Sequence, residues 1–336
     1  MITPPRVSIL MPLRNEAAYL PAALDSLTRQ TLLDWELIAV DDGSQDDTPA
    51  MLAAAACRDS RIRVIRNTGV GLVAALNYGL EACRATLVAR MDGDDICHPR
   101  RLELQATHLD QHVDTGLVAC NFRHFPRSTL KQGMLSYESW QNTLETHEQI
   151  MRDRFVESPF CHPSIMVRRG LIEQVGGYRD SGWAEDYDLW LRLADNGTRF
   201  TRLALPLFFW RDHPERATRT MSEYSVDAFR ACKMHFLLQD FLHHEQSVTI
   251  AGAGQEGRAW QRLLAAAGIS VSRWVDVDPR RIGRTLHGAP VVTTEHLTAR
   301  KDKILVAIGV RGAREQFRQL VQYLDLKEGL DFICVA

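Results

Sequence analysis

The sequence lacks several features that would point to particular classes of protein. Its 7 cysteines are scattered along 336 residues without a C-x-x-C pair, so neither a disulfide framework nor a thiolate metal site is predicted. Lys and Arg (40) nearly balance Asp and Glu (42), and no basic stretch alternates with aromatic residues. A nucleic-acid partner is therefore not expected.

Long apolar runs are also missing. No segment approaches the length needed to cross a bilayer, and the N-terminus does not combine a charged region with an apolar stretch as secretory signals do. We therefore expect a cytoplasmic protein without a transmembrane segment, able to work at the inner face of a membrane. At 336 residues, the chain exceeds one average domain, so two domains are expected.

Three short apolar runs in the N-terminal half each end in a polar cluster. Residues 7–13, 36–40 and 86–91 are apolar enough for strands buried on both faces. Helical patterns over 17–28 and 47–57 separate the first runs, which predicts a doubly wound α/β sheet. Ligands of such sheets bind beyond the carboxyl ends of the strands, where the following polar residues lie: Arg14, Asn15, Glu16, Asp41, Asp42, Asp92, Asp94 and Asp95.

The acidic stretch 92–95 is the most informative of these clusters. Three carboxylates within four residues repel one another, so a cation is expected among them. Hard oxygen ligands suit Mg²⁺ or Mn²⁺, which commonly hold a diphosphate. The alternative is a solvated Asp-Gly turn.

Five motifs in order resemble those of a family 2 glycosyltransferase of GT-A fold. They are VSILMPLRNE, VDDGSQDDT, RNTGVGLVAALNYGL, MDGDDICHPRRL and GGYRDSGWAEDYDLWLRL, and the resemblance covers about residues 7–213. It implies a GT-A mixed sheet in a catalytic domain over 1–215. It also implies a hexosyltransferase-type enzyme that moves a sugar from a nucleotide-diphosphate sugar, such as a UDP-sugar, with inversion and with Mn²⁺ or Mg²⁺.

The resemblance assigns roles on the donor side. Asp94 would bind the metal, and Asp92 would face the ribose or join the metal site. His213 would contact the metal or a phosphate, and Asp95 would be a nearby orienting carboxylate or would cap a helix that begins at Ile96. Arg100 or Arg101 would reach a phosphate, or would be solvated on a helix. The full set of implied donor-binding residues is Pro12, Arg14, Asn15, Glu16, Asp41, Asp42, Asn67, Asp92, Asp94 and Arg101.

The acidic stretch 185–188 supplies candidates for the base that deprotonates the acceptor. Asp186 and Asp188 project about 200° apart around a helix, so both cannot face one sugar. The resemblance favours Asp186 as the base and Glu185 as its partner, while Asp188 suits a helix dipole. Trp183 and His162 would lie on the acceptor side, although a buried aromatic residue and a structural histidine are the alternatives.

The C-terminal part begins a second alternation of strands and helices. A helix over 222–244 is expected to connect the domains (linker 216–246), followed by a small Rossmann-like domain over 247–336. Gly252, Gly254, Gly257 and Asp276 occupy the positions of a dinucleotide fingerprint. A nucleotide ligand is one interpretation, and a domain kept for packing or homo-oligomerisation is the other.

Two other functional classes are compatible with parts of the sequence. An NAD-dependent nucleotide-sugar oxidoreductase would use the C-terminal fingerprint, and a catalytically silent nucleotide-sugar-binding scaffold would keep the fold alone. Nucleotidyl transfer is disfavoured because a Gly-rich, Lys-bearing phosphate loop is missing. The acceptor expected for a transferase is a hydroxyl of a sugar, a lipid-linked glycan or a protein.

Overall fold

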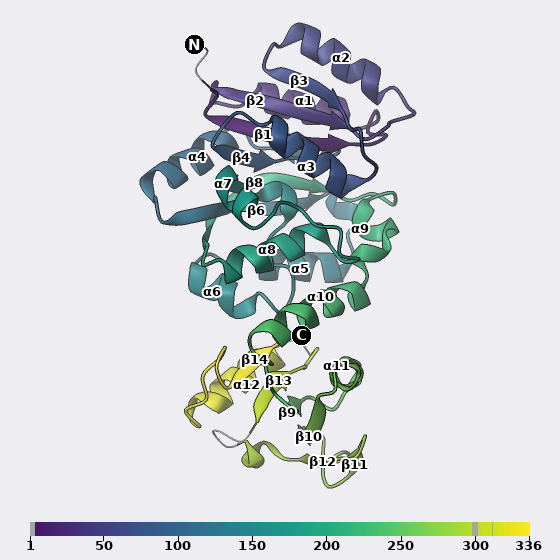
Figure 1. Ribbon diagram of the computed structural model, residues 1–336, viewed down its shortest axis with the longest axis vertical. Coiled ribbons are helices and arrows are strands. Elements are labelled where there is room, and N and C mark those ends of the chain that lie inside the picture. Colours follow the sequence, from purple (N-terminus) through teal and green to yellow (C-terminus); the bar gives the residue numbers. More distant parts are fainter. Residues whose placement is uncertain (1–3, 298–301, 311) are drawn as a thin grey trace. The chain divides into compact units, whose positions relative to one another are not determined.

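The computed structural model describes residues 4–297, 302–310 and 312–336. The chain forms two compact units (Figure 1). The first unit comprises Met1–Met151 and Pro159–Met221, and the second comprises Arg152–Ser158 and Ser222–Ala336. Within the described ranges, no helix has both the length and the apolar character that crossing a membrane requires.

An eight-stranded mixed sheet organises the first unit, in the order β3-β2-β1-β4-β7-β6-β8-β5. Strands β1 to β4 pair in parallel, whereas β7 is antiparallel to both β4 and β6. The strands are β1 (Val7–Leu13), β2 (Trp35–Asp41), β3 (Ile62–Arg66), β4 (Leu87–Arg90), β5 (Ile96–Cys97), β6 (Thr115–Phe125), β7 (Met166–Arg168) and β8 (Arg199–Arg211).

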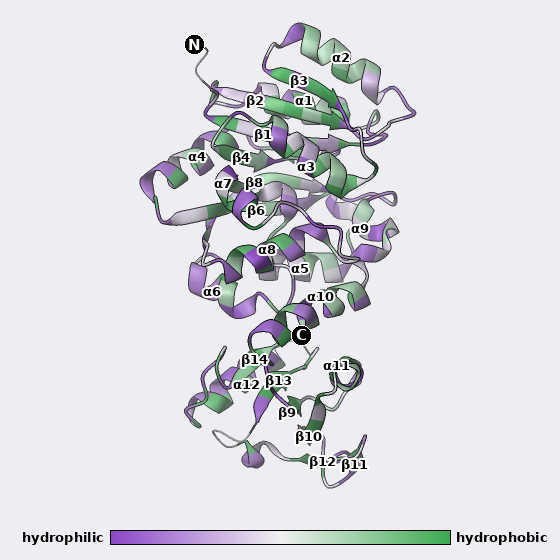
Figure 2. Cartoon of the chain, in the orientation of Figure 1, coloured by the Kyte–Doolittle hydropathy of each residue, from purple (hydrophilic) through white to green (hydrophobic). Residues whose placement is uncertain are grey.

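Helices cover both faces of this sheet, as its buried strands require. The α-helices are α1 (Leu20–Thr28), α2 (Thr48–Arg58), α3 (Leu72–Ala82), α4 (Arg101–Gln111), α5 (Gln132–Gln141), α6 (His147–Asp153), α7 (Arg169–Gln174), α8 (Glu185–Asp195) and α9 (Ala217–Thr220). The short 3₁₀ helices are η1 (Arg127–Thr129) and η2 (His162–Ser164). Figure 2 shows both apolar and polar segments on α6 and α8, and in α8 the polar residues are buried as well, because residues 185–194 are all buried.

Strand β1 shows how the two faces are filled. All seven of its residues are buried. Ile9 and Met11 join the core formed with helices α1, α2 and α4. Leu10 points to the other face, where a Cβ on Gly79 of α3 would lie 2.3 Å from Leu10 Cδ1. Because side chains alternate along a strand, this continuous apolar run buries both faces and leaves function to the strand ends.

The second unit has a six-stranded sheet of order β11-β12-β10-β9-β13-β14. All its pairings are parallel except that of β11 with β12. The strand order reverses beside β9, as in doubly wound folds. The elements are η3 (Ser222–Tyr224), α10 (Val226–Gln239), β9 (Ser247–Ala251), α11 (Gln255–Ala266), β10 (Ser270–Val275), β11 (Thr285–Leu286), β12 (Ala289–Val292), η4 (Thr294–His296), β13 (Lys303–Val306), α12 (Ala313–Gln322) and β14 (Phe332–Cys334).

Two expectations from the sequence need correction. The single helix over 222–244 is shorter: α10 covers Val226–Gln239, and Ser225 caps it by accepting a hydrogen bond from the backbone N–H of Ala228. No helix begins at Ile96, because 96–97 form strand β5 and helix α4 begins at Arg101. The domain limits 1–215, 216–246 and 247–336 stay a prediction, and the compact units group α10 with the second sheet.

Candidate active site

The turns after β1 and β2 are bonded to each other. Asn15 adopts a left-handed conformation with φ of 59°, which Asn tolerates better than most residues. Its backbone N–H donates to Ser44 Oγ at 3.0 Å, and its side-chain oxygen accepts from the N–H of Gln45 at 2.8 Å. The N–H of Glu16 donates to Thr48 Oγ1 at 2.8 Å. These bonds fix Asn15 and Glu16 at the carboxyl edge of the sheet; Pro12 is buried in β1, and Arg14 is exposed.

Asp41, Asp42 and Asn67 form the adjoining part of this edge. Asp42 Oδ1 accepts from Asn67 Nδ2 at 2.6 Å and from the N–H of Gly71 at 3.2 Å. The N–H of Asn67 donates to the carbonyl of Asp41 at 2.8 Å. These hydrogen bonds join the end of β2 to the segment after β3, as expected if both line one donor-binding site.

Asp92, Asp94 and Asp95 come together after β4. One oxygen of each lies within 4.8 Å of the others. Asp95 is fully buried and accepts from the backbone N–H of Arg211 at 2.6 Å. Burial, with the charges of Asp94 and Asp92, raises the pKa of Asp95 well above its usual range.

Glycine at position 93 allows the turn between these acids to lie against the turn after β1. A Cβ there would lie 2.7 Å from Leu13 Cδ2 and 2.9 Å from Glu16 Cγ. Glu16 consequently lies near the acidic cluster. Burial first, and then the charges of Asp94 and Asp92, raise the pKa of Glu16 to about 8.

His213 belongs to the same cluster. Its Nε2 lies 2.8 Å from Asp94 Oδ2, and its Nδ1 lies 3.2 Å from Glu215 Oε2. The hydrogen bond to Asp94 raises the pKa of His213. The tertiary fold thus brings a nitrogen ligand from the segment after β8 to the carboxylates after β4.

This donor set fits a divalent cation. Three carboxylates supply hard oxygen atoms of the kind that Mg²⁺ and Mn²⁺ bind. The second oxygen of Asp95, Oδ2, is buried without a hydrogen-bond partner. An unpartnered buried carboxylate oxygen is costly, and a cation within the cluster would remove that cost.

The second acidic pair lies at the start of α8. Glu185 and Asp186 are 5% and 9% exposed. Burial and the charge of Glu185 raise the pKa of Asp186 well above its usual range. His162 Nδ1 lies 3.4 Å from Glu185 Oε1, and its Nε2 lies 3.1 Å from the hydroxyl of Tyr178. His162 therefore holds Glu185 beside the candidate base.

Asp188 and Trp183 have a separate arrangement. Asp188 Oδ1 accepts from Trp183 Nε1 at 3.1 Å, and its Oδ2 lies 2.6 Å from the guanidinium of Arg192. An acid already paired with an arginine is a poor base. Trp183 is half-buried, and its indole N–H is directed to Asp188.

Arg101 does not fit the predicted contact with a donor phosphate. It is 1% exposed, and its Nη2 donates to the carbonyls of Arg90 at 2.8 Å and Ile165 at 3.1 Å. The guanidinium therefore ties two backbone segments inside the core. Arg100, the alternative, is exposed and pairs with Glu103 at 3.3 Å.

Three arginines near the acidic clusters were not identified from the sequence. Arg90 is buried and lies 2.6 Å from Asp92 Oδ1, and its charge also acts on Asp186. Arg211 donates to the carbonyl of Asp94 at 2.6 Å. Arg216 is 7% exposed, and its guanidinium lies 4.0 Å from the ring centroid of Trp210. The position of Arg90 two residues before the acidic stretch was the one available signal.

In the second unit, two of the fingerprint glycines lie against neighbouring backbone. A Cβ on Gly257 would lie 1.9 Å from the carbonyl oxygen of Gly252, and one on Gly252 would lie 2.6 Å from the carbonyl of Ala307. A Cβ on Gly254 would lie 3.9 Å from Arg281 Nη1, an ordinary van der Waals contact. Asp276 Oδ2 accepts from the N–H of Ala253 at 2.8 Å and from Arg281 Nη1 at 2.9 Å. A ribose would have to compete with these internal donors for Asp276.

Comparison with known proteins gives consistent matches. The family described as "Glycosyl transferase family 2" matches residues 8–176. The putative glycosyltransferase EpsE of Bacillus subtilis is 31% identical over 260 residues, which cover 71% of this chain and 86% of EpsE.

Solved structures show the GT-A fold. Staphylococcus aureus TarS in complex with UDP-GlcNAc has a TM-score of 0.54 and 18% identity, covering 77% of this chain and 71% of TarS. The mannosyltransferase PcManGT of Pyrobaculum calidifontis, in complex with GDP-Man and Mn²⁺, has a TM-score of 0.52 and 20% identity, covering 79% of this chain and 70% of PcManGT.

Proposed function

The chain belongs to glycosyl transferase family 2 and is a glycosyltransferase. We propose that it transfers a sugar from a UDP-sugar with inversion, and that the reaction depends on a divalent metal. The observation that carries this proposal is the convergence of Asp92, Asp94, Asp95 and His213 beside the turns after β1 and β2. Membership of the family disfavours the NAD-dependent oxidoreductase and the silent scaffold.

We assign donor binding to the carboxyl edge of the first sheet. Asp41, Asp42 and Asn67 offer carboxylate and amide groups that suit a uracil imide and ribose hydroxyls. Asp92 and Asp94, with His213, would hold Mn²⁺ or Mg²⁺. When bound, such a cation neutralises charge that develops on the departing diphosphate. The positive charges of Arg211 and Arg216 lie near the same cluster and favour the same anion.

Asp186 is the proposed base for the acceptor hydroxyl. Its raised pKa makes the carboxylate a stronger proton acceptor than an ordinary aspartate. Burial first, and then the charge of Glu185, raise the pKa of Asp186. His162, which is itself hydrogen-bonded to Tyr178, contacts Glu185. Attack of the deprotonated hydroxyl on the face opposite the leaving diphosphate would invert the anomeric carbon.

The acceptor is proposed as the hydroxyl of a glycan, a lipid-linked sugar or a glycoprotein. For the second unit, we keep the proposal of a Rossmann-like accessory domain, which its strand order and fingerprint glycines support.

A panel of nucleotide sugars tests the proposed function. Purified protein is incubated with each donor and Mn²⁺, and released nucleotide is measured. We expect slow hydrolysis of one UDP-sugar, with NMR showing a first-formed sugar of inverted anomeric configuration. Release that persists undiminished in EDTA would contradict metal dependence, and retention of configuration would contradict the assignment of Asp186.

A further inference from the structure

The second unit includes a short segment whose neighbours in the sequence, on both sides, belong to the first unit. Residues Arg152–Ser158, which we call the strap, follow most of α6 and precede η2, yet they group with Ser222–Ala336. Phe155 and Val156 of the strap are 4% and 8% exposed. The strap is therefore packed as part of the second unit.

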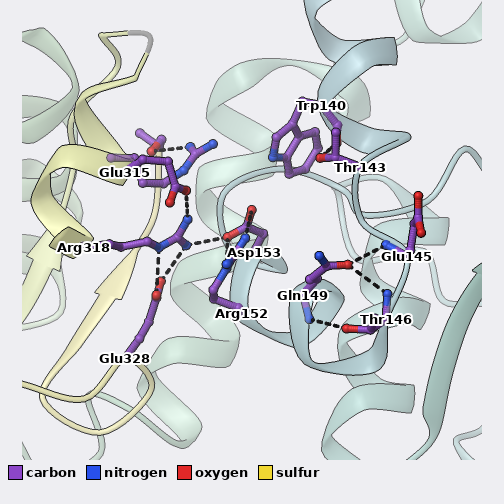
Figure 3. A network of polar contacts seen from close by, with 12 residues as sticks. Trp140, Thr143, Glu145, Thr146, Gln149, Arg152, Asp153, Glu315, Arg318 and Glu328 are labelled. Carbon is purple, nitrogen blue, oxygen red and sulfur yellow. Dashed lines mark hydrogen bonds and ion pairs between the residues drawn. The ribbon is translucent and has the colours of Figure 1, made fainter. Parts of the chain in front are cut away.

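An ion-pair network holds the first half of the strap. Asp153 is 2% exposed, and its Oδ1 pairs with Arg318 Nη2 from α12. Arg318 also lies 2.8 Å from Glu328 Oε1 and pairs with Glu315 (Figure 3). Arg152 Nε lies 3.1 Å from Asp153 Oδ1. A buried carboxylate depends on its partners, and Arg318 is a partner of Asp153 that comes from outside the strap.

A buried lysine holds the second half. Lys233 of α10 is 5% exposed, and its ammonium donates to the carbonyl of Val156 at 2.7 Å and to that of Val335 at 3.2 Å. Burial lowers the pKa of Lys233. The ammonium thus joins the strap to the end of β14, so both halves of the strap are fixed by cations of the second unit.

The strap leads directly to the acceptor side of the active site. Only Pro159, Phe160 and Cys161 separate its last residue from His162, which contacts Glu185. The connection is stiff: the carbonyl of Pro159 accepts from Arg202 at 2.6 Å, and Phe160 packs edge-on against Trp190 with ring centroids 5.4 Å apart. A connection of three residues that is held at two points has little slack between the strap and His162.

We propose that the strap is a positioning device: Arg318 and Lys233 hold it within the second unit, and it fixes His162 and, through His162, Glu185 beside the catalytic Asp186. The C-terminal unit then acts on catalysis by placing the acceptor-side residues. This inference rests on the proposed function, because Glu185 and Asp186 take their roles from it.

The test compares three variants of the full chain. Arg318→Met removes a charge that pairs with Asp153, Arg318→Lys restores it, and Arg280→Met removes an exposed arginine of the same unit that pairs with Asp278. For Arg318→Met we expect kcat of UDP-sugar hydrolysis to fall about 10- to 100-fold, as small misplacements of catalytic groups do. The Kd for UDP with Mn²⁺ should stay within about twofold, since the donor side is not attached to the strap. Arg318→Lys should recover much of the kcat, and Arg280→Met should match the parent protein.

Hydrogen exchange distinguishes an effect of the strap on η2 from general destabilisation of the protein. In Arg318→Met, we expect faster exchange at the amides of Ser164 and Ile165, which bond within η2, as well as in residues 153–158. An increase that ends at residue 158, or an unchanged kcat, would overturn the proposal. Asp153→Asn, which keeps the shape of the side chain, replaces Arg318→Met if that variant does not fold. If the parent protein shows no turnover, the proposed function fails, while hydrogen exchange still decides the role of the strap.

Discussion

Three acids of the candidate active site differ from two acids at the carboxyl edge of the second sheet. In the first unit, the pKa values of Glu16, Asp95 and Asp186 are raised by burial and by neighbouring acids. In the second unit, hydrogen bonds from Arg280 lower the pKa of Asp278 to about 2. Asp276 also has a lowered pKa, because hydrogen bonds from the N–H groups of Asp278 and Ala253 and from Arg281 outweigh its burial.

This contrast indicates which of the two sites is suited to catalysis. Acids held together without sufficient counter-charge cost stability, and such costs concentrate at functional sites. At the second edge, hydrogen bonds from residues of the same unit stabilise the ionised acids, as in a structural site. The four predictions below compare substitutions at the first edge with a matched one at the second.

The largest effect is expected at the metal cluster. Asp94→Ala removes one of its carboxylates and the partner of His213. Loss of the cation's stabilisation, worth several kcal/mol, should reduce donor hydrolysis by more than about a thousandfold. Circular dichroism should show an intact fold. Near-normal turnover in this variant would remove Asp94 from the metal site.

The proposed base comes next. Asp186→Asn keeps the shape of the side chain but cannot take a proton, so kcat should fall by about a hundredfold or more. UDP binding measured by calorimetry should be unchanged. Asp276→Asn at the second edge is the matched control and should leave kcat intact; equal losses in the two variants would mean that Asp186 acts only on folding.

A shift in pH dependence should be smaller but diagnostic. Asp186 must be unprotonated to act, so kcat should rise with pH through its raised pKa. Glu185→Gln removes the negative charge that helps to raise this pKa, and the acidic limb of the kcat profile should move to lower pH. A limb that stays in place would assign the limiting ionisation to another group.

The smallest effect is expected in the second unit. Arg281→Met removes a partner of Asp276, and because Arg281 is 40% exposed, the loss of stability should be about 1 kcal/mol or less. Asp276 has a lowered pKa, so its contribution is present above its unfolded pKa of about 3.9 and is lost as the pH falls through its folded value. Urea unfolding should therefore show a difference at pH 7 that persists to about pH 5 and shrinks only below about pH 4. A drop in donor hydrolysis would contradict the separation of the two edges.

The strand ends were predictable because apolar runs and the acids that follow them are local features of the sequence. Asp92 and Asp94 lie in such a pattern, whereas Asp186 was predicted from an acidic stretch that resembles the family's Glu-Asp motif. Membership of the family and the GT-A fold were also confirmed. The metal, the donor and the role of each site residue stay predictions.

Tertiary contacts account for what the sequence did not reveal. Arg101 follows the acidic motif and was expected at a phosphate, but the carbonyls of Arg90 and Ile165 draw it into the core. Arg216 lies more than a hundred residues from Asp95 in the chain, and only the fold brings its charge near that carboxylate. A helix cap was one of two expectations for Asp95, yet no helix begins at Ile96 and the backbone N–H of Arg211 donates to Asp95 Oδ1.

The central claim is that a divalent cation binds between the carboxylates after β4. Crystals soaked with MnCl₂ and UDP test it through anomalous scattering at the manganese edge. The account predicts a strong peak within coordination distance of Asp94 and of the UDP diphosphate. Ordered UDP at the carboxyl edge of the first sheet, with no manganese peak beside Asp94, would contradict it.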